Sequence, residues 1–267
     1  MASTFSVKGY WKHKKLGRKA VSKAPTLKLS KYLNYKSLPP IPAELERYTS
    51  LTDWTMMGND TYGDCTCAAA GHGIMARTSE YSLITPSETS VLAVYTAVTA
   101  KECSCAGFNA TTDANDNGCI ITDVQDYWKT VGVDGHKIDL YTSVDITNHG
   151  EVRNATYLFG LLNIGLALPL TAQDQPTLWD VTDTTLSGNA APGSWGGHDV
   201  IIVGYNATTL DLITWGERIK MTWAFWNAYV DEAYAILAPD WFSTSSPHHI
   251  SPTGLSLAQL EADMKLV

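Results

Sequence analysis

Residues 59–72, NDTYGDCTCAAAGH, place a cysteine at the point where a tight turn leads into a helix. Gly63 allows the tight turn, and the alanines at positions 68–70 predict a slim helix that can be buried in a core. A thiol in the first turn of a helix faces unpaired backbone N–H groups and the positive end of the helix dipole, which stabilise its thiolate form. The stretch therefore predicts that Cys65 is a nucleophile carried by a helix N-terminus.

A thiol nucleophile needs a base, and a second stretch offers one. Residues 196–216, GGHDVIIVGYNATTLDLITWG, contain two apolar runs around a turn, which predict two paired strands. His198 opens the first of these strands and lies 133 residues after Cys65 (198 − 65). That separation is typical of a nucleophile and a base that come from different halves of one fold.

These stretches resemble the papain-like cysteine peptidases. GDCTCAAA is similar to the cysteine block of that family, GGHDVIIVGY to its histidine block and ITWGE to the strand that follows. The resemblance covers roughly residues 50–240 and is specific at the blocks around Cys65 and His198. It implies that Cys65 is the nucleophile and His198 the base. It also implies that Asn59, six residues before the cysteine (65 − 59), is an oxyanion donor in place of the family's glutamine.

One position departs from the family's pattern. The family has an asparagine directly before its Ser-Trp-Gly, where it orients the histidine, and this chain has Ile213 there. Thr214 and Asp211 are the candidate replacements, but strand alternation points them to opposite faces, so only one can serve. Losing the orienting group usually weakens catalysis without abolishing it. Trp195 and Trp215 flank the predicted base, and in the family a tryptophan at the latter position shields the histidine from water.

Local patterns predict an α+β fold. Thr85, Thr122 and Asn148 each stand at a cap position before a helical segment, and the first of these helices is expected to end near residue 101. From Asn163 onward, short apolar runs divided by Gly, Pro, Asn and Asp predict strands, with one short helix capped by Thr222 between them. A helical lobe followed by an antiparallel β-rich lobe is also what the papain-like resemblance implies.

The expected domain organisation has three parts. An extended basic arm spans residues 1–42, a papain-like domain spans 43–245, and a tail with a short helix at 257–264 spans 246–267. Within the domain, the helical lobe covers about 43–160 and the β lobe about 161–245.

Charge is distributed unevenly along the chain. The formal net charge is −8, but residues 1–40 contain ten Lys or Arg and no acidic residue, which leaves 9 basic (19 − 10) against 27 acidic residues in the rest. The arm is neither long nor helical enough for a papain-like prosegment, so we interpret it as a docking arm. Its partner could be nucleic acid, an acidic protein surface, a larger assembly or the protein's own body. The nucleic-acid alternative depends on charge alone.

The five cysteines leave two alternatives open: five reduced thiols, or two bridges with Cys65 free. We expect Cys67 to be structural, because it points about 200° around the helix axis from Cys65. The two Cys-x-Cys pairs do not match zinc spacing, so no metal or cofactor is expected. The longest apolar run, 157–170, has 14 residues and is too short and too broken to span a membrane. Without a recognisable signal peptide, a cytoplasmic location is expected, with a virion as the alternative.

Two functions are consistent with this sequence. The preferred one is a papain-like cysteine hydrolase, a peptidase or amidase, that acts on a peptide or amide substrate through Cys65 and His198. The alternative is an eroded papain-like module that serves in binding or structure and docks through its basic arm onto a larger assembly such as a phage particle.

Overall fold

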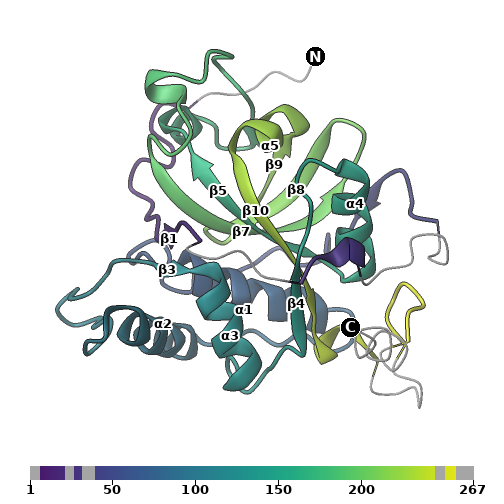
Figure 1. Ribbon diagram of the computed structural model, residues 1–267, viewed down its shortest axis with the longest axis horizontal. Helices are drawn as coiled ribbons and strands as arrows, with labels where there is room; N and C mark the ends of the chain where they lie inside the picture. Colours follow the sequence, from purple (N-terminus) through teal and green to yellow (C-terminus); the bar gives the residue numbers. More distant parts are fainter. Residues whose placement is uncertain (1–6, 22–26, 32–39, 244–249, 257–267) are drawn as a thin grey trace.

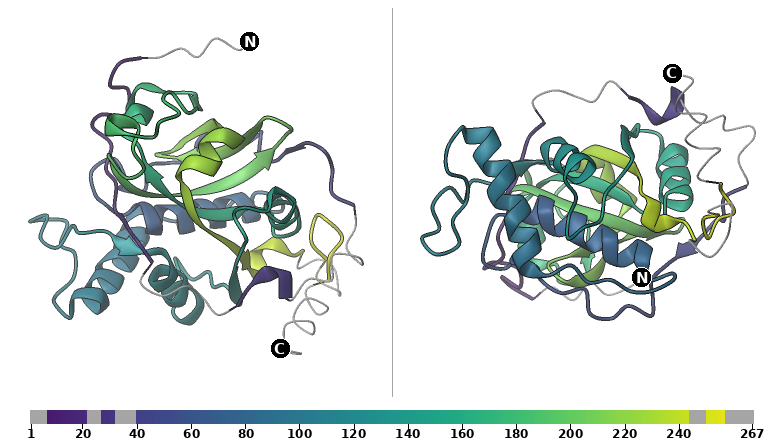
Figure 2. Two further views of the ribbon diagram at one scale, coloured as in Figure 1. Left: turned by 45° about the horizontal axis from the view of Figure 1, so that its top comes forward. Right: turned by 90° about the horizontal axis from the view of Figure 1, so that it is seen from below.

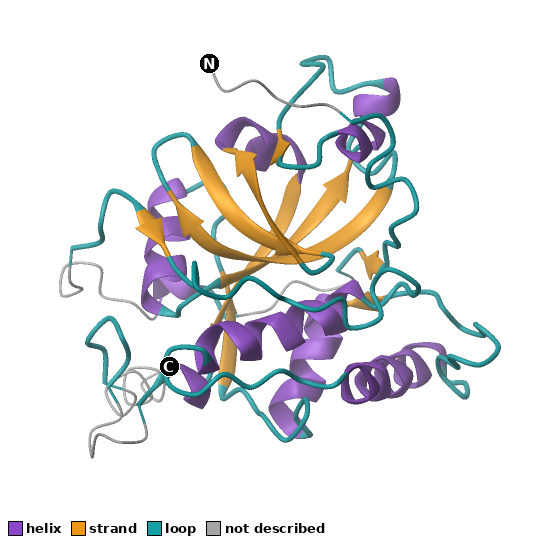
Figure 3. Ribbon diagram, turned by 180° about the vertical axis from the view of Figure 1, so that it is seen from behind, coloured by secondary structure: helices purple, strands orange, loops and turns teal. Residues whose placement is uncertain are grey.

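Three helices lie in one half of the computed structural model and the main sheet lies in the other, where two further helices pack on it; the structure describes residues 7–21, 27–31, 40–243 and 250–256 (Figure 3). The helices of the first half are α1 (Cys65–Thr78), α2 (Glu88–Cys103) and α3 (Ile121–Thr130). The second half contains the main sheet, against which α4 (His149–Leu158) and α5 (Trp223–Tyr229) pack (Figure 1). This is the α+β, two-lobed arrangement that the sequence predicts.

The main sheet has eight strands in the order β4-β10-β5-β7-β8-β9-β6, with β2 beside β7. All neighbouring strands are antiparallel except β6 and β9. The central strand β7 is buried along most of its length, as expected for its continuous apolar run. The strands are β2 (Leu45–Glu46), β4 (Leu140–Ser143), β5 (Leu162–Leu168), β6 (Leu178–Trp179), β7 (Gly196–Tyr205), β8 (Thr209–Thr214), β9 (Glu217–Thr222) and β10 (Val230–Leu237).

A second, two-stranded sheet lies where the two halves meet (Figure 1). It pairs β1 (Arg18–Lys19), from the basic arm, in parallel with β3 (Cys119–Ile120). The arm therefore contributes a strand to the body of the protein.

Helix α1 lies at the centre of the molecule, and each of its residues is buried. Small side chains allow this position: a Cβ atom at Gly71 would lie 2.3 Å from the sulfur of Met57. At the C-terminal end, the buried guanidinium of Arg77 donates hydrogen bonds to the carbonyl oxygens of Phe159 and Ile236. These contacts fix α1 against the sheet, so the residue at its N-terminus is held rigidly as well.

The caps test the predicted helix boundaries. Asn148 accepts hydrogen bonds from the backbone N–H groups at the start of α4, and Thr222 accepts one at the start of α5, so both of these caps are confirmed. Ser87, rather than Thr85, caps α2. The cap predicted at Thr122 is wrong, because α3 follows directly on β3 and Thr122 already lies in its first turn. The helix expected at 257–264 lies outside the described residues.

Within the described ranges, each helix is either too short or too polar to cross a lipid bilayer.

Candidate active site

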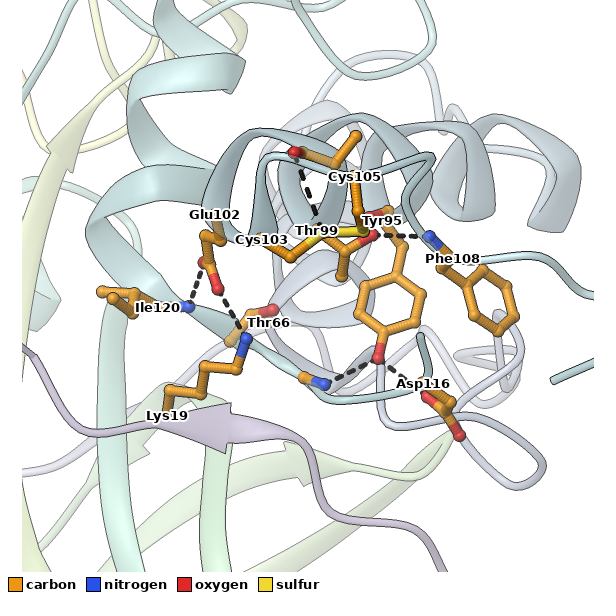
Figure 4. A network of polar contacts seen from close by, with 12 residues as sticks. Lys19, Thr66, Tyr95, Thr99, Glu102, Cys103, Cys105, Phe108, Asp116 and Ile120 are labelled. Atoms are coloured by element: carbon orange, nitrogen blue, oxygen red, sulfur yellow. Dashed lines mark hydrogen bonds and ion pairs between the residues drawn. A yellow bond between two sulfur atoms is a disulfide. The ribbon is translucent and has the colours of Figure 1, made fainter. Parts of the chain in front are cut away.

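Cys65 is the first residue of α1, directly after the turn that the sequence predicts. Asp116 fixes this turn, because its Oδ1 accepts a hydrogen bond from the backbone N–H of Gly63 at 2.8 Å. The same oxygen accepts a hydrogen bond from the Tyr95 hydroxyl at 2.7 Å (Figure 4). The side chain of Asp64, just before the nucleophile, is buried, and this burial raises the pKa of its carboxyl well above the usual value. The Asp64 carboxyl makes a small contribution to the raised pKa of the Cys65 thiol.

The thiol of Cys65 is buried in this state of the protein. Burial is the main reason why its pKa lies above the ordinary value, and the Asp199 carboxyl adds to the effect. Backbone N–H groups of Asp199 and Gly17 hydrogen-bond to the sulfur and act in the opposite direction. Burial is the larger influence, so Cys65 is held as a neutral thiol.

His198 lies on β7, directly before Asp199, so its strand is in contact with the sulfur of Cys65. Its Nε2 is 2.8 Å from the hydroxyl of Thr214, whereas its Nδ1 has no partner among the described residues. The Trp215 ring stacks on the imidazole with the centroids 4.2 Å apart, and Trp195 packs on Trp215 at 5.6 Å. Trp215 thus covers one face of the imidazole, and Trp195 lies behind Trp215.

The imidazole of His198 is neutral in this state. Burial lowers its pKa to about 3, and the nearby positive charge of Arg18 acts in the same direction. The buried His72 makes a smaller contribution of the same sign. Neither the thiol nor the imidazole of the predicted pair is therefore charged.

Of the candidate orienting groups, only Thr214 contacts the imidazole. Asp211 lies on the opposite face of β8, where it forms ion pairs with Arg218 and Lys220 on the neighbouring strand. Ile213, at the position of the family's asparagine, is fully buried in the core. The hydrogen-bonding group has thus moved by one residue along the strand.

Asn59, the predicted oxyanion donor, is buried in the turn before Cys65. Its side-chain N–H group donates to the carbonyl oxygen of Tyr62 at 3.2 Å. The carboxamide lies in the correct turn but is engaged within its own loop, so its role in stabilising an oxyanion stays a prediction.

The sequence did not predict that the basic arm lies across this site. The backbone N–H of Trp11 donates to the carbonyl oxygen of Gln173 at 3.0 Å, and the Trp11 ring packs on Trp215 with the centroids 4.9 Å apart. The indole N–H of Trp215 in turn donates to the carbonyl oxygen of Lys15 at 3.0 Å. Figure 2 shows this part of the chain, in purple, running along one side of the β-rich half toward the helices.

Gly17 is the point at which the arm crosses the thiol. Its carbonyl oxygen accepts a hydrogen bond from the backbone N–H of Cys119 at 2.8 Å. A Cβ atom at position 17 would lie 1.6 Å from the carbonyl oxygen of Gly63, and one at Gly118 would lie 1.7 Å from that of Gly17. Only glycine fits at this crossing.

Charged residues of the arm then bind the body. Arg18 is buried and forms ion pairs with Glu232 and Asp231. Lys19 contacts Glu102 at 2.7 Å, and Glu102 also accepts a hydrogen bond from the backbone N–H of Ile120 (Figure 4). Of the partners that the sequence left open, the described part of the arm uses the protein's own body.

The sequence analysis interpreted the arm as a docking arm and not as a prosegment; its described part has turns at residues 8–13 followed by the short strand β1, and Gly17 lies against the thiol of Cys65. Trp11, Gly17, Arg18 and Glu232 belong to this site, and the sequence analysis missed them. The opposite charges of arm and body were the available signal, but they did not identify individual partners.

The cysteines match neither of the two predicted arrangements. Cys103 and Cys105 form a disulfide, and Cys65, Cys67 and Cys119 are free and buried. Cys67 lies inside the helical half beside Cys119, as expected for a structural residue. In the described ranges, no group of three or more His, Cys, Asp or Glu side chains is arranged to hold a metal ion.

Comparison with known proteins supports the fold. No protein-family model matches the sequence, and no curated protein does. Among solved structures, xylellain, a cysteine protease from Xylella fastidiosa, superposes with a TM-score of 0.60 at 13% identity, over 84% of this chain and 96% of that one. ProCathepsin B S9 from Trypanosoma congolense gives a TM-score of 0.55 at 9% identity, over 84% and 86% of the two chains.

A third similar structure is digestive procathepsin L 3 from the larval midgut of Tenebrio molitor. It gives a TM-score of 0.54 at 12% identity, over 86% of this chain and 77% of that one. All three matches extend over both the helical and the β-rich halves. The chain therefore has the two-lobed fold of the papain-like cysteine proteases.

Proposed function

We propose that this protein is a cysteine hydrolase, a peptidase or amidase, whose active site is closed by its own N-terminal arm. The observation that carries the proposal is the position of Cys65. It lies at the N-terminus of α1 against the strand that bears His198, whose imidazole is hydrogen-bonded to Thr214. This arrangement supplies a nucleophile, a base and an orienting group in one place.

In the open state, the Cys65 thiolate attacks the carbonyl carbon of the substrate and forms a C–S bond. The carbonyl oxygen becomes an oxyanion, which the backbone N–H of Cys65 and the Asn59 amide stabilise. The His198 imidazolium gives its proton to the leaving nitrogen or oxygen, whose bond to carbon then breaks. Water, deprotonated by His198, attacks the resulting thioester, releases the acid and regenerates the thiol.

The closed state opposes the first step of this reaction. Burial under the arm disfavours the thiolate of Cys65, and burial together with the charge of Arg18 disfavours the imidazolium of His198. Departure of the arm admits water and removes Arg18. Both changes favour the thiolate–imidazolium pair.

The alternative function, an eroded binding module, was based on the isoleucine at the position of the family's asparagine. The hydroxyl of Thr214 supplies a hydrogen bond to the imidazole from the next residue, so Ile213 no longer argues for erosion.

Alkylation of Cys65 by iodoacetamide as a function of pH tests the proposal. The assay uses the Gly17→Ala chain, in which the arm cannot lie in its place, and locates the label by peptide mass spectrometry. We expect an alkylation midpoint well below the ordinary thiol pKa of about 8.5, and we expect it to return to that value in Gly17→Ala/His198→Ala. An ordinary midpoint in Gly17→Ala would refute the Cys–His pair.

Thr214→Val in the Gly17→Ala background is expected to slow Cys65 alkylation at about pH 6 roughly fivefold. The substitution removes an acceptor that stabilises the imidazolium, and such a hydrogen bond contributes about 1 kcal/mol. Thr214→Ser keeps the hydroxyl and should retain the parent rate. If Thr214→Val and Thr214→Ser give the same rate of Cys65 alkylation, Thr214 does not orient the imidazole.

A further inference from the structure

We infer that Glu232 and Asp231 form a substrate pocket for a basic side chain, and that Arg18 of the arm fills this pocket in the closed protein. The inference rests on the proposed function of the neighbouring Cys65. It names the class of substrate: peptides with an arginine or lysine next to the residue that lies on the thiol.

The pocket is built to hold a guanidinium group. Glu232 is buried, and its two carboxylate oxygens have different partners: Oε1 contacts Nη1 of Arg18, and Oε2 accepts from the hydroxyl of Tyr234. The Tyr234 contact fixes the carboxylate so that its other oxygen faces the cation. Asp231 is 44% exposed at the mouth of the pocket and lies 2.7 Å from Nη2 of Arg18. A planar guanidinium thus meets one acid at each nitrogen.

Two glycine residues leave space for the guanidinium group. A Cβ atom at Gly165, on the neighbouring strand β5, would lie 2.6 Å from Cγ of Glu232 and 2.8 Å from Nη1 of Arg18. On β7, a Cβ atom at Gly197 would lie 2.2 Å from the carbonyl oxygen of Arg18. The adjacent strands β5 and β7 therefore each have a glycine where Arg18 lies.

The pocket is next to the reacting atoms. Gly17 donates its backbone N–H to the sulfur of Cys65, and Arg18 is the following residue. Gly197 directly precedes His198 on β7. A peptide that replaced the arm would therefore bring one residue to the thiol and the side chain of its neighbour to Glu232.

A larger acidic cavity continues from the pocket. It has a volume of about 430 Å³, and the body contributes Asp145 and Glu151 to its lining in addition to the pocket acids. The arm contributes the opposite wall, which includes Lys28. When the arm leaves, this side of the cleft becomes an acidic groove that complements a basic peptide.

Departure of the arm also leaves Glu232 without its cation. A buried carboxylate that loses its partner is strongly disfavoured, whereas a substrate guanidinium or ammonium restores the pair. A neutral or acidic side chain in the pocket would leave the carboxylate uncompensated. The pocket therefore selects for basic side chains and against others.

Binding to the full-length chain tests the inference without requiring turnover. Cys65→Ala prevents reaction and Arg18→Ala empties the pocket. The probes are acetyl-arginine amide and its uncharged isostere acetyl-citrulline amide, titrated by calorimetry. We expect the arginine probe to bind Arg18→Ala/Cys65→Ala about tenfold more tightly than the citrulline probe does. Binding to Cys65→Ala alone should be weaker, because Arg18 occupies the pocket.

Variants of the acids complete the test. Glu232→Gln keeps the contact with Tyr234 and is expected to abolish the preference for arginine. Asp231→Asn, at the more exposed position, should reduce it and serves as a second variant if Glu232→Gln fails to fold. Asp123→Asn removes an acid from an ion pair with Lys101 on the helical half and should change nothing.

The outcomes separate this inference from the proposed function. Equal binding of the two probes, or a preference that survives both acid substitutions, overturns the basic pocket. That conclusion would hold even if Gly17→Ala were an active hydrolase. An arginine preference that depends on Glu232 supports the pocket even if no hydrolysis is found, in which case the proposed function alone fails.

Discussion

Replacing Gly17 with alanine is expected to raise the rate of Cys65 alkylation at neutral pH by at least about 100-fold. The added methyl group would lie 1.6 Å from the carbonyl oxygen of Gly63, a backbone atom in the turn that positions the nucleophile. Because that turn is fixed by Asp116, the arm must move instead. Once it moves, the thiol is exposed to water and its pKa falls. Each unit of this decrease raises the thiolate fraction about tenfold.

Two measurements check this result. Iodoacetamide labelling, quantified by mass spectrometry at Cys65, gives the rate, and brief trypsin treatment at Arg18 and Lys19 reports whether the arm has left the cleft. Gly135→Ala is the control, since it is also a Gly→Ala substitution but has no atom within 4 Å of the added Cβ. If the arm becomes sensitive to trypsin while Cys65 stays unreactive, the arm does not control the thiol.

His198 and Asp199, neighbours on β7, are expected to give opposite pH dependences of the free energy of unfolding. The pKa of His198 is lowered from 6.5 to about 3 in the folded protein. Between these values the unfolded chain binds the proton and the folded chain does not, so stability falls as pH falls. Between about pH 7 and pH 5 the loss due to His198 is about 2 kcal/mol.

The pKa of Asp199 is raised by burial, so the sign reverses. The folded protein keeps a proton that the unfolded chain releases above its ordinary carboxyl pKa, and stability is lost as pH rises through the folded value. Urea denaturation at the two pH values measures both effects. Between about pH 7 and pH 5, the free energy of unfolding of His198→Asn should fall by about 2 kcal/mol less than that of the parent. That of Asp199→Asn should fall by more than that of the parent. Parallel behaviour of the parent and His198→Asn would show that the imidazole is not buried and neutral.

The parts of the site that sequence predicts are those set by local spacing. The glycine turn, the cysteine and the alanines specify the start of α1 within a few residues, and the apolar runs around His198 specify the β7–β8 hairpin. Strand alternation also predicts that Thr214 and Asp211 cannot both face the imidazole. It could not say which of them does, because that choice depends on how β8 lies against β7.

The rest depends on contacts between distant segments. The closing of the site brings together Gly17, Gly63 and Gly118, and nothing in their separate sequence contexts indicates that three backbones meet there. Similarly, the acidic character of residues 231–232 is visible in the sequence, but their ion pairs with a residue more than 200 positions earlier are not. The contacts of the arm with the protein's own body, one of the partners that the sequence left open, could not be assigned to individual residues for the same reason.

The covalent connection between the arm and the body determines how the closed state can be opened. Arg18 and Lys19 are joined to the body at β2, 26 residues later (45 − 19), so in the proposed hydrolase the arm would act as an inhibitor attached to its own target. A tether of this kind gives a local concentration on the order of millimolar, which a substrate at micromolar concentration cannot outcompete. A single peptide-bond cut between Lys19 and Leu45 would turn the arm into a separate peptide that is lost on dilution. Inhibition that is persistent in the intact chain would then end irreversibly, with no change to any residue of the active site.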